Sequence, residues 1–333
     1  MHQPPYSPYG EMSCGKINPL PLAASRIVFG TATGPMISGE NADEMLDGAA
    51  ERGVNFFDCA RSYGRAEEVL GDWIRRRGNR DQVIVLTKCG DIRNGIVKVN
   101  RQVIREQLET SLKTLQTDHI DLFLLHRDDP DTPVAEIMET LHGVKQEGKI
   151  LLYGVSNWTT ERIREANRYA AQNGIMEFSV SSPNYGLARQ MADLWGGGCV
   201  SLTGPEHQAD REWYAETRIP LIAYSSLGRG FFSGKFRADD PEEARRVLDS
   251  YAQKGYLYPE NLRRLERAEK LARKKGLSVP EIAMRYVFAS PMNVFAVVST
   301  TKPERLDGSI RAAADPLTAE EAGWLEEGGE PNV

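Results

Sequence analysis

The sequence contains few cysteines and no cluster of metal ligands. Its four cysteines, Cys14, Cys59, Cys89 and Cys199, are far apart and include no CxxC pair. Such spacing argues against a structural zinc site and against the disulfide framework of a small secreted protein. The five histidines are scattered and form no HExxH pair. We therefore expect reduced thiols, no metal site and a cytoplasmic location.

The chain also lacks an excess of positive charge and any long apolar run. Its formal net charge is −6, from 41 Lys+Arg and 47 Asp+Glu, which disfavours a general attraction to nucleic acid or to an anionic membrane surface. No run approaches the roughly 18 apolar residues of a membrane span, and the first residues show no basic-then-apolar signal segment. A small-molecule partner is therefore expected, and neither nucleic acid nor a membrane. The oligomeric state cannot be inferred.

Short apolar runs alternate with helical patterns along most of the chain. The candidate strands are Ile27–Gly30, Val54–Asp58, Val83–Lys88, Ile120–His126, Leu152–Ser156, Phe178–Ser182, Leu221–Ser225 and Phe295–Ser299. Eight is the number that a closed parallel barrel requires. In the third and fourth runs the apolar residues are consecutive, which is typical of strands covered on both faces.

Helices are expected between these strands. Three helix starts are marked in the sequence. Asn41 with Glu44 forms a capping pattern, Asn100 can cap a second helix, and Pro133 stands in the first turn of a third. Further helical segments are expected near Glu161–Gln172, Asn261–Lys275, Val279–Ala289 and Glu304–Ala314. The prediction is an α/β protein: an irregular lead-in over residues 1–24, then a single (β/α)8 TIM barrel over 25–329 with extra helices near the C-terminus.

A doubly wound open sheet is the competing architecture. Its dinucleotide-binding form needs GxGxxG after the first strand. The sequence there is Gly30-Thr-Ala-Thr-Gly-Pro-Met, and the glycines between Gly228 and Gly234 come late and with the wrong spacing. The barrel is therefore favoured.

Three of the candidate strands end on an ionisable residue: Asp58, Lys88 and His126. In a parallel barrel all carboxyl ends meet at one rim, so these side chains should converge there, with Tyr63 close by in an Arg-Ser-Tyr-Gly turn. Each has a simpler explanation taken alone, as a turn residue, a solvated lysine, a buried histidine or a packing aromatic. Four such residues in this order favour a catalytic group.

The chemistry that these residues could perform is proton transfer to a carbonyl oxygen. A phenol with a pKa of about 10 gives up its proton reluctantly. The Lys88 ammonium would stabilise the Tyr63 phenolate, and Asp58 would keep Lys88 charged and in place. His126 could donate a hydrogen bond that polarises the carbonyl.

The sequence resembles the aldo-keto reductase superfamily from about Arg26 to about Ala314. The matching stretches are Asn55-Phe-Phe-Asp-Cys-Ala-Arg-Ser-Tyr63-Gly, Leu86-Thr-Lys88, Asp121-Leu-Phe-Leu-Leu-His126-Arg, Gly148-Lys-Ile, Gly154-Val-Ser-Asn157, Tyr224-Ser-Ser-Leu-Gly-Arg-Gly and Ser299-Thr-Thr-Lys-Pro-Glu-Arg305. The resemblance implies that Asp58, Tyr63, Lys88 and His126 form a catalytic tetrad with Tyr63 as proton donor. It also implies a nicotinamide cofactor lying across the barrel mouth.

The resemblance suggests a cofactor contact for each matching segment. Ser156, Asn157 and Ser182 would face the nicotinamide carboxamide, and Tyr224 would stack on the ring. The remaining expected contacts, in the loops after the first, seventh and eighth strands, are Gly30, Thr31, Ser225, Ser226, Leu227, Gly228, Arg229, Ser299, Thr300, Thr301, Lys302 and Arg305.

The last of these loops predicts the type of cofactor. Thr301 and Glu304 should form a capping box, so that free backbone N–H groups and the cations Lys302 and Arg305 would lie together. This arrangement favours NADPH over NADH, because only NADPH carries the extra phosphate. A charged, solvated first helical turn is the alternative.

Three departures from the family pattern are visible. Ser182 replaces a glutamine that usually contacts the carboxamide, and Ser309 replaces an asparagine that often contacts the adenine. The N-terminal hairpin that usually closes the barrel floor cannot be recognised before Arg26.

The expected activity is NADPH-dependent reduction of a small aldehyde or ketone. The rim should include Met36, Arg127, Trp158, Trp195 and Arg229, with Trp195 on a glycine-rich loop. Aromatics beside arginines suit aromatic aldehydes and also sugar- or polyol-derived carbonyls, which we favour.

Three other functions compete with this one. A non-catalytic nicotinamide-binding subunit or redox sensor, and an epimerase that retains its nicotinamide, remain alternatives. A glycosidase is disfavoured, because Asp128, Asp129 and Asp131 crowd into one loop instead of facing each other across the mouth.

Overall fold

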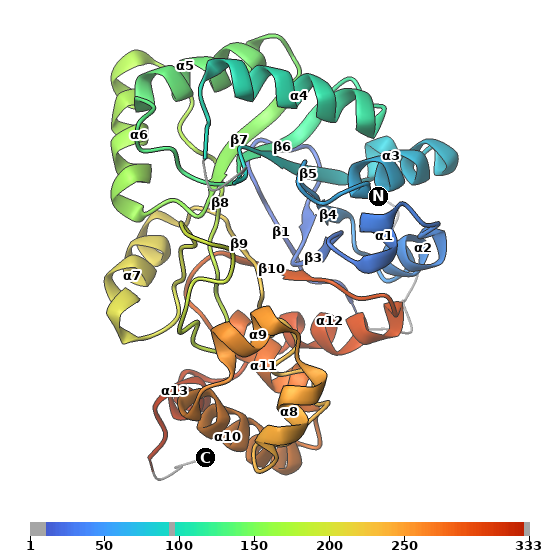
Figure 1. Cartoon of the computed structure of the whole chain (residues 1–333), viewed down its shortest axis with the longest axis vertical. Coiled ribbons are helices and arrows are strands. Elements are labelled where there is room, and N and C mark those ends of the chain that lie inside the picture. Colours follow the sequence, from blue (N-terminus) through green and yellow to red (C-terminus); the bar gives the residue numbers. More distant parts are fainter. Residues whose placement is uncertain (1–10, 93–96, 330–333) are drawn as a thin grey trace.

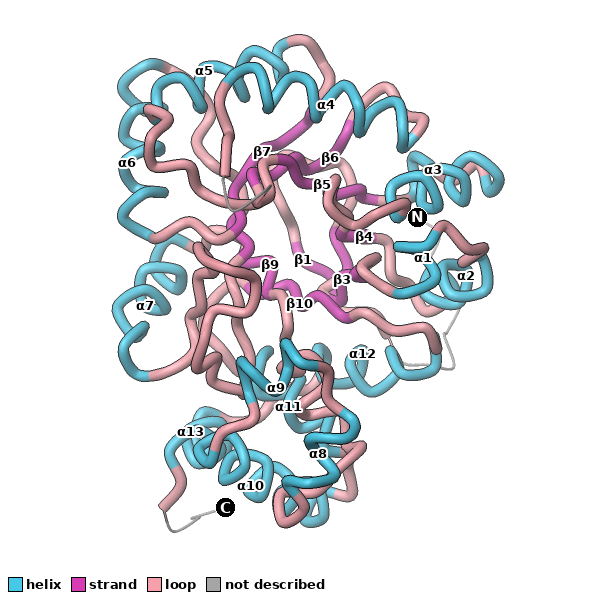
Figure 2. The backbone as a smooth tube through the Cα atoms, viewed as in Figure 1, coloured by secondary structure: helices cyan, strands magenta, loops and turns pink. Residues whose placement is uncertain are grey.

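The computed structural model describes residues 11–92 and 97–329 and contains a closed eight-stranded parallel barrel. The barrel strands are β3 (Ile27–Gly30), β4 (Phe56–Asp58), β5 (Ile84–Cys89), β6 (Ile120–Leu125), β7 (Ile150–Ser156), β8 (Ser181–Ser182), β9 (Leu221–Ala223) and β10 (Val294–Val298). They pair in chain order and β10 closes on β3 (Figure 2). The predicted TIM barrel is confirmed, and all eight strands overlap the predicted runs.

Helices surround the barrel (Figure 1). Those that precede β9 are α1 (Gly34–Ser38), α2 (Asp43–Glu51), α3 (Ala66–Arg77), α4 (Arg101–Leu115), α5 (Val134–Gln146), α6 (Thr160–Asn173) and α7 (Gln208–Thr217). Those that follow β9 are α8 (Pro241–Val247), α9 (Ser250–Tyr256), α10 (Pro259–Lys275), α11 (Val279–Phe288), α12 (Leu306–Ala314) and α13 (Ala319–Glu327). Of these, α8, α9, α10 and α13 gather to one side of the barrel, as the extra helices of the prediction (Figure 1).

The sixth predicted strand, which corresponds to β8, illustrates how the observed strand ends differ from the predicted ones. Only Ser181–Ser182 of the expected Phe178–Ser182 is regular strand. Pro183 follows directly and has no N–H to donate, so the ladder cannot continue. At the other end, the backbone N–H of Phe178 donates to the side chain of Asn167 at 3.0 Å instead of to a neighbouring strand.

Two short strands lie within the segment that was expected to be an irregular lead-in. β1 (Cys14–Gly15) and β2 (Ala24–Ser25) form an antiparallel pair, with Cys14 opposite Ser25. Between them, Ile17 is buried against barrel-interior side chains such as Phe56 and Phe295. This hairpin contributes apolar side chains to the barrel interior near the start of β3, and it was not predicted from the sequence.

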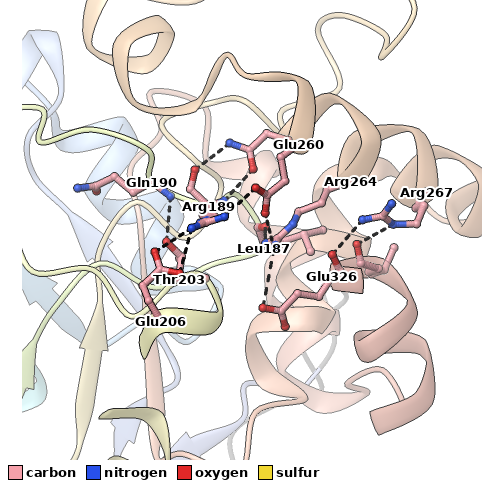
Figure 3. A network of polar contacts seen from close by, with 12 residues as sticks. Leu187, Arg189, Gln190, Thr203, Glu206, Glu260, Arg264, Arg267 and Glu326 are labelled. Carbon is pink, nitrogen blue, oxygen red and sulfur yellow. Dashed lines mark hydrogen bonds and ion pairs between the residues drawn. The ribbon is translucent and has the colours of Figure 1, made fainter. Parts of the chain in front are cut away.

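A long loop over residues 183–204 follows β8 and is fixed to the C-terminal helices (Figure 3). Arg264 of α10 donates to the carbonyl of Leu187 at 2.8 Å and pairs with Glu260 at 3.0 Å. Arg189 pairs with Glu260 at 2.9 Å and with Glu206 at 3.0 Å. The base of the loop is therefore held by ion pairs, and one of their members, Arg264, is buried.

Candidate active site

Four polar side chains meet at the carboxyl ends of neighbouring strands. Asp58 is the last residue of β4, Lys88 lies in β5, and His126 directly follows β6. Tyr63 stands in the turn between β4 and α3. The structure thus brings together all four residues that the sequence assigned to one rim.

The buried ion pair between Lys88 and Asp58 is the centre of this group. Their side-chain atoms Nζ and Oδ1 lie 2.5 Å apart, and Nζ also donates to the carbonyl of Cys59 at 2.9 Å. Both side chains are buried. Burial raises the pKa of Asp58, against the opposing effect of Lys88. Burial alone would lower the pKa of Lys88, but Asp58 and Tyr63 outweigh it, so the pKa of the ammonium is raised.

Tyr63 lies beside this pair. The Lys88 ammonium is 5.1 Å from the centroid of the Tyr63 ring, and the ring meets His126 edge to face at 5.8 Å between centroids. Burial raises the pKa of Tyr63 to about 12, while the Lys88 charge lowers it. Lys88 therefore acts on the phenol in the expected direction, although burial dominates and the net pKa is above that of a free phenol.

His126 is a neutral imidazole in this environment. Burial, followed by the charge of Lys88, lowers its pKa to about 3 against the opposing effect of Asp91. The Nδ1 atom of His126 lies 3.7 Å from the Asp91 carboxylate and 3.4 Å from the Ser62 hydroxyl. The sequence analysis missed both neighbours, although Asp91 follows the Lys88 strand closely enough to be placed at the same rim.

Asn157 links several residues that were assigned to the nicotinamide. Its Nδ2 donates to the carbonyl of His126 at 3.1 Å and to Ser156 Oγ at 2.9 Å. Its Oδ1 accepts from the Tyr224 hydroxyl at 2.7 Å and from the Val200 backbone N–H at 3.2 Å. The amide is therefore fully hydrogen-bonded within the protein and holds the ends of β6, β7 and β9 together.

The Ser182 side chain is hydrogen-bonded within the barrel. Its hydroxyl donates to the carbonyl of Ile222 at 2.8 Å, and its own carbonyl accepts from the Ser156 hydroxyl at 2.8 Å. Both serine side chains therefore serve the strand ends of the barrel.

The loop over Ser225–Arg229 follows β9 in tight turns. The N–H of Gly228 donates to Ser225 at 2.7 Å, and Ser225 and Arg229 have φ values of 53° and 52°. Ser226 Oγ donates to the carbonyl of Ala223 at 3.1 Å. Arg229 pairs with the half-exposed Asp249 at 2.8 Å. Part of the expected backbone cradle is thus committed to the turns themselves.

The loops after β3 and β10 approach each other closely. A Cβ atom on Gly30 would lie 2.3 Å from Ser299 Oγ, so only glycine fits there. Thr31 is buried and its hydroxyl donates to the carbonyl of Asp58 at 2.9 Å. These contacts connect the residues assigned to the cofactor with those assigned to catalysis.

The predicted capping box of Thr301 and Glu304 is not formed. The segment Pro303–Arg305 is a short 3₁₀ turn whose cap is Lys302, with no side-chain cap bond, and α12 begins only at Leu306. The Thr300 hydroxyl accepts from the N–H of Lys302 at 3.0 Å instead. The difference lies in where the turn begins: its N-cap is Lys302, one residue after Thr301, so Thr301 does not occupy the capping position.

The other predicted rim residues divide into two groups. Met36 is fully buried, and Trp158 is buried with its ring packed edge to face against Phe178. Trp195 lies on the loop tip, 5.8 Å from Tyr224 between ring centroids, with the guanidinium groups of Arg127 and Arg229 at 6.0 and 5.5 Å from its own ring.

The tip of this loop is organised by one carboxylate. Asp193 accepts from the backbone N–H groups of Trp195 at 2.9 Å, Gly197 at 3.2 Å and Cys199 at 2.8 Å. Trp195 is thereby held over the side of the mouth where Tyr224 lies.

Within the described parts of the chain, no three His, Cys, Asp or Glu side chains are grouped so that they could hold a metal ion. All four cysteines are free. Among the helices of residues 11–92 and 97–329, none is both long and apolar enough to cross a membrane.

The chain was compared with known proteins. A model described as "Aldo/keto reductase family" matches residues 26–329. The aldo-keto reductase YhdN of Bacillus subtilis (strain 168) is 30% identical over 317 residues, 90% of this chain and 88% of that protein. Aldo-keto reductase str7 of Strobilurus tenacellus is 28% identical, covering 86% of this chain and 81% of its own. A probable voltage-gated potassium channel subunit beta of Oryza sativa subsp. japonica is 27% identical, covering 87% and 88%.

Proposed function

The chain belongs to the aldo/keto reductase family, and we propose that it is an NADPH-dependent oxidoreductase that reduces a small aldehyde or ketone to an alcohol. A sugar- or polyol-derived carbonyl is the substrate class that we favour, because aromatic and arginine side chains border the mouth. The observation that carries the proposal is the buried Lys88–Asp58 pair beside Tyr63 and a neutral His126.

In the proposed mechanism Tyr63 protonates the carbonyl oxygen. A reduced nicotinamide, when bound at the mouth, would be the source of the hydride for the carbonyl carbon. The phenolate that forms at Tyr63 is stabilised by the Lys88 ammonium, which Asp58 keeps charged and in position. His126 stays neutral and orients the carbonyl oxygen by hydrogen bonding.

The residues after β10 fit a phosphate better than a plain ribose. Lys302 and Arg305 are exposed, and among the described residues neither has a carboxylate within 4.0 Å. Two cations without partners on one short turn suit the additional phosphate of NADPH. Comparable catalytic efficiency with NADH and NADPH would contradict this assignment.

Replacing Tyr63 by Phe tests the catalytic assignment. The variant should lose carbonyl reduction by a factor of at least about 10², because the proton donor is gone, while NADPH binding stays nearly intact. Steady-state turnover of an activated aldehyde and NADPH titration by fluorescence measure the two effects.

Tyr169→Phe is a matched control for this experiment. Tyr169 donates to Glu139 on the outer helices at 2.7 Å, far from the strand ends in the chain's topology. It should leave turnover unchanged. Near-normal turnover in the Tyr63 variant would assign the proton to another group.

A non-catalytic role is the second candidate, because one relative is named as a potassium channel subunit. Tight NADPH binding without consumption by any aldehyde in a broad panel would favour it. Rapid NADPH consumption would favour the reductase.

A further inference from the structure

Arg127, next to His126 in the chain, is a buried arginine without a carboxylate partner. Three arginines in the described parts of the chain are less than a tenth exposed: Arg52, Arg127 and Arg264. Arg52 pairs with Asp307 at 2.6 Å and Arg264 with Glu260 at 3.0 Å. Arg127, 5% exposed, has no carboxylate within 4.0 Å among these residues. Arginine is almost never buried unless it is paired, so this one requires an explanation.

The guanidinium of Arg127 is only partly hydrogen-bonded. Its Nη1 donates to the carbonyl of His126 at 3.1 Å. Its Nε is buried and has no acceptor among the described residues. The edge of the group that carries Nε therefore lacks a protein acceptor, and it has the geometry that pairs with two oxygens of one anion side by side.

The position of Arg127 is at the reacting end of the mouth. The His126 carbonyl that accepts from Arg127 also accepts from Asn157 Nδ2. The Trp195 ring lies 6.0 Å from the guanidinium carbon, and a Cβ atom on Gly198 would lie 3.7 Å from Arg127 Cδ. Gly198 thus approaches Arg127 without a side chain, while the Trp195 ring of the same loop lies beside the guanidinium.

We propose that Arg127 binds an oxyanion carried by the carbonyl substrate, in the first place a carboxylate, so that the enzyme selects acidic aldehydes or ketones over neutral ones. This rests on the proposed function. The planar fork of the guanidinium matches a carboxylate in two parallel hydrogen bonds, and the Trp195 ring covers it. The carbonyl of such a substrate would reach Tyr63 and His126 while its acidic group neutralises Arg127.

Two nearby groups bear on this assignment. Arg229, on the loop assigned to the cofactor, lies against the same Trp195 ring but is already paired with Asp249. Asp91 is an acidic group in the same region: burial alone would raise its pKa, but hydrogen bonds and the positive charge of Arg127 lower it. Among the described residues its carboxylate is not within 4.0 Å of the Arg127 guanidinium, whereas it lies 3.7 Å from His126 Nδ1. Asp91 would repel a bound anion, so Asp91→Asn should tighten binding.

The first experiment measures anion binding without turnover. Benzoate and phenyl phosphate are titrated calorimetrically into the protein saturated with NADP⁺. We expect benzoate to bind, and Arg127→Gln to weaken its affinity by about tenfold or more, as for a lost charged hydrogen-bonded contact. Binding of phenyl phosphate alone, lost in the same variant, would support the oxyanion site with a phosphate as its ligand.

Arg162→Gln is the matched control. The Arg162 guanidinium also lies over a tryptophan, Trp158 at 5.3 Å, but it pairs with Asp128 and Glu165 at 3.4 and 3.0 Å. Its loss should not change anion binding. Arg127→Lys keeps the positive charge but loses the two parallel hydrogen bonds of the guanidinium, so its affinity for benzoate should be intermediate. This variant keeps the test conclusive if Arg127→Gln does not fold.

The second experiment measures selectivity in turnover. The 2-, 3- and 4-carboxybenzaldehydes are compared with their methyl esters in the wild type, in Arg127→Gln and in the control Arg162→Gln. We expect at least one acid to exceed its ester in kcat/KM by about tenfold, and this ratio to fall towards one in Arg127→Gln only.

The outcomes separate this inference from the proposed function. Reduction of neutral aldehydes with no effect of the carboxylate would overturn the inference and leave the proposed function standing. Arg127-dependent benzoate binding without any turnover would support the anion site and reject the reductase. An Arg127→Gln variant that loses NADPH affinity and shows no change towards anions would also overturn the inference, because the arginine would then serve the cofactor.

Discussion

Replacing Lys88 by methionine should destabilise the protein in a way that depends on pH. Methionine keeps much of the side-chain volume but removes the only ammonium that contacts Asp58 in the described structure, at 2.5 Å. Asp58 is 5% exposed, so the variant must either bury an unpaired carboxylate or protonate it. Removing one member of a buried ion pair costs about 3–5 kcal/mol.

The direction of the pH effect follows from the pKa of Asp58. Burial already raises that pKa, and Lys88 is the group that lowers it. Without Lys88 the folded-state pKa rises further above the unfolded value. The folded variant then binds a proton that the unfolded chain releases, so its stability falls as pH rises above the unfolded pKa of about 3.9. The slope is at most about 1.4 kcal/mol per pH unit, or roughly 2.7 kcal/mol between pH 5 and 7.

Urea unfolding followed by circular dichroism at several pH values measures this effect. The stability difference between wild type and Lys88→Met should shrink as pH falls towards 5. The double variant Asp58→Asn with Lys88→Met removes both charges and should recover most of the stability while staying catalytically poor. A single-variant penalty that does not change with pH, or a double variant as unstable as the single one, would refute the reasoning.

Three further predictions follow from other parts of the mouth. Replacing Lys302 and Arg305 together by methionine should weaken NADPH binding by about tenfold at low salt and by less at high salt, while NADH binding stays unchanged. Fluorescence titration with both cofactors checks this, and an equal loss of affinity for NADH would contradict it. Since burial lowers the pKa of His126 to about 3, kcat/KM for reduction should show no ionisation of this residue between about pH 5 and 8, and an inflection there that disappears in His126→Asn would count against a neutral imidazole. Gly30→Ala should place its Cβ against Ser299 Oγ and lower the free energy of unfolding by about 1–3 kcal/mol through overpacking. Thermal unfolding measures this loss, which Ser299→Gly in the same chain should partly restore. An unchanged unfolding temperature would show that the two loops can separate freely.

The barrel was predictable because its strands are covered on both faces. Consecutive apolar residues such as those of β5 and β6 follow directly from that burial. The observed bounds of these two strands lie within one residue of the predicted runs. The meeting of Asp58, Lys88 and His126 at one rim was also predictable, because parallel strands share a direction. Their catalytic roles remain predictions.

Other features depend on contacts that no local pattern encodes. The extent of β8 is set by Pro183 and by a side chain of α6, and the hairpin before Arg26 has strands of only two residues. The expected cap at Thr301 is not formed because the turn begins one residue later, at Lys302, whose N–H donates to the Thr300 hydroxyl. The burial of Trp158 depends on Phe178, twenty positions away.

The clamp between the loop after β8 and the C-terminal helices has a consequence for how specificity is determined. Arg264 contacts the loop through Leu187 and lies 3.9 Å from Glu326 in α13, while Arg267 donates to the carbonyl of Leu325 at 2.9 Å (Figure 3). The indole at the loop tip is therefore held at its height above the strand ends partly by residues outside the barrel. Substitutions in α10 and α13, which border no ligand, should then alter which molecules fit while the chemical step itself stays the same.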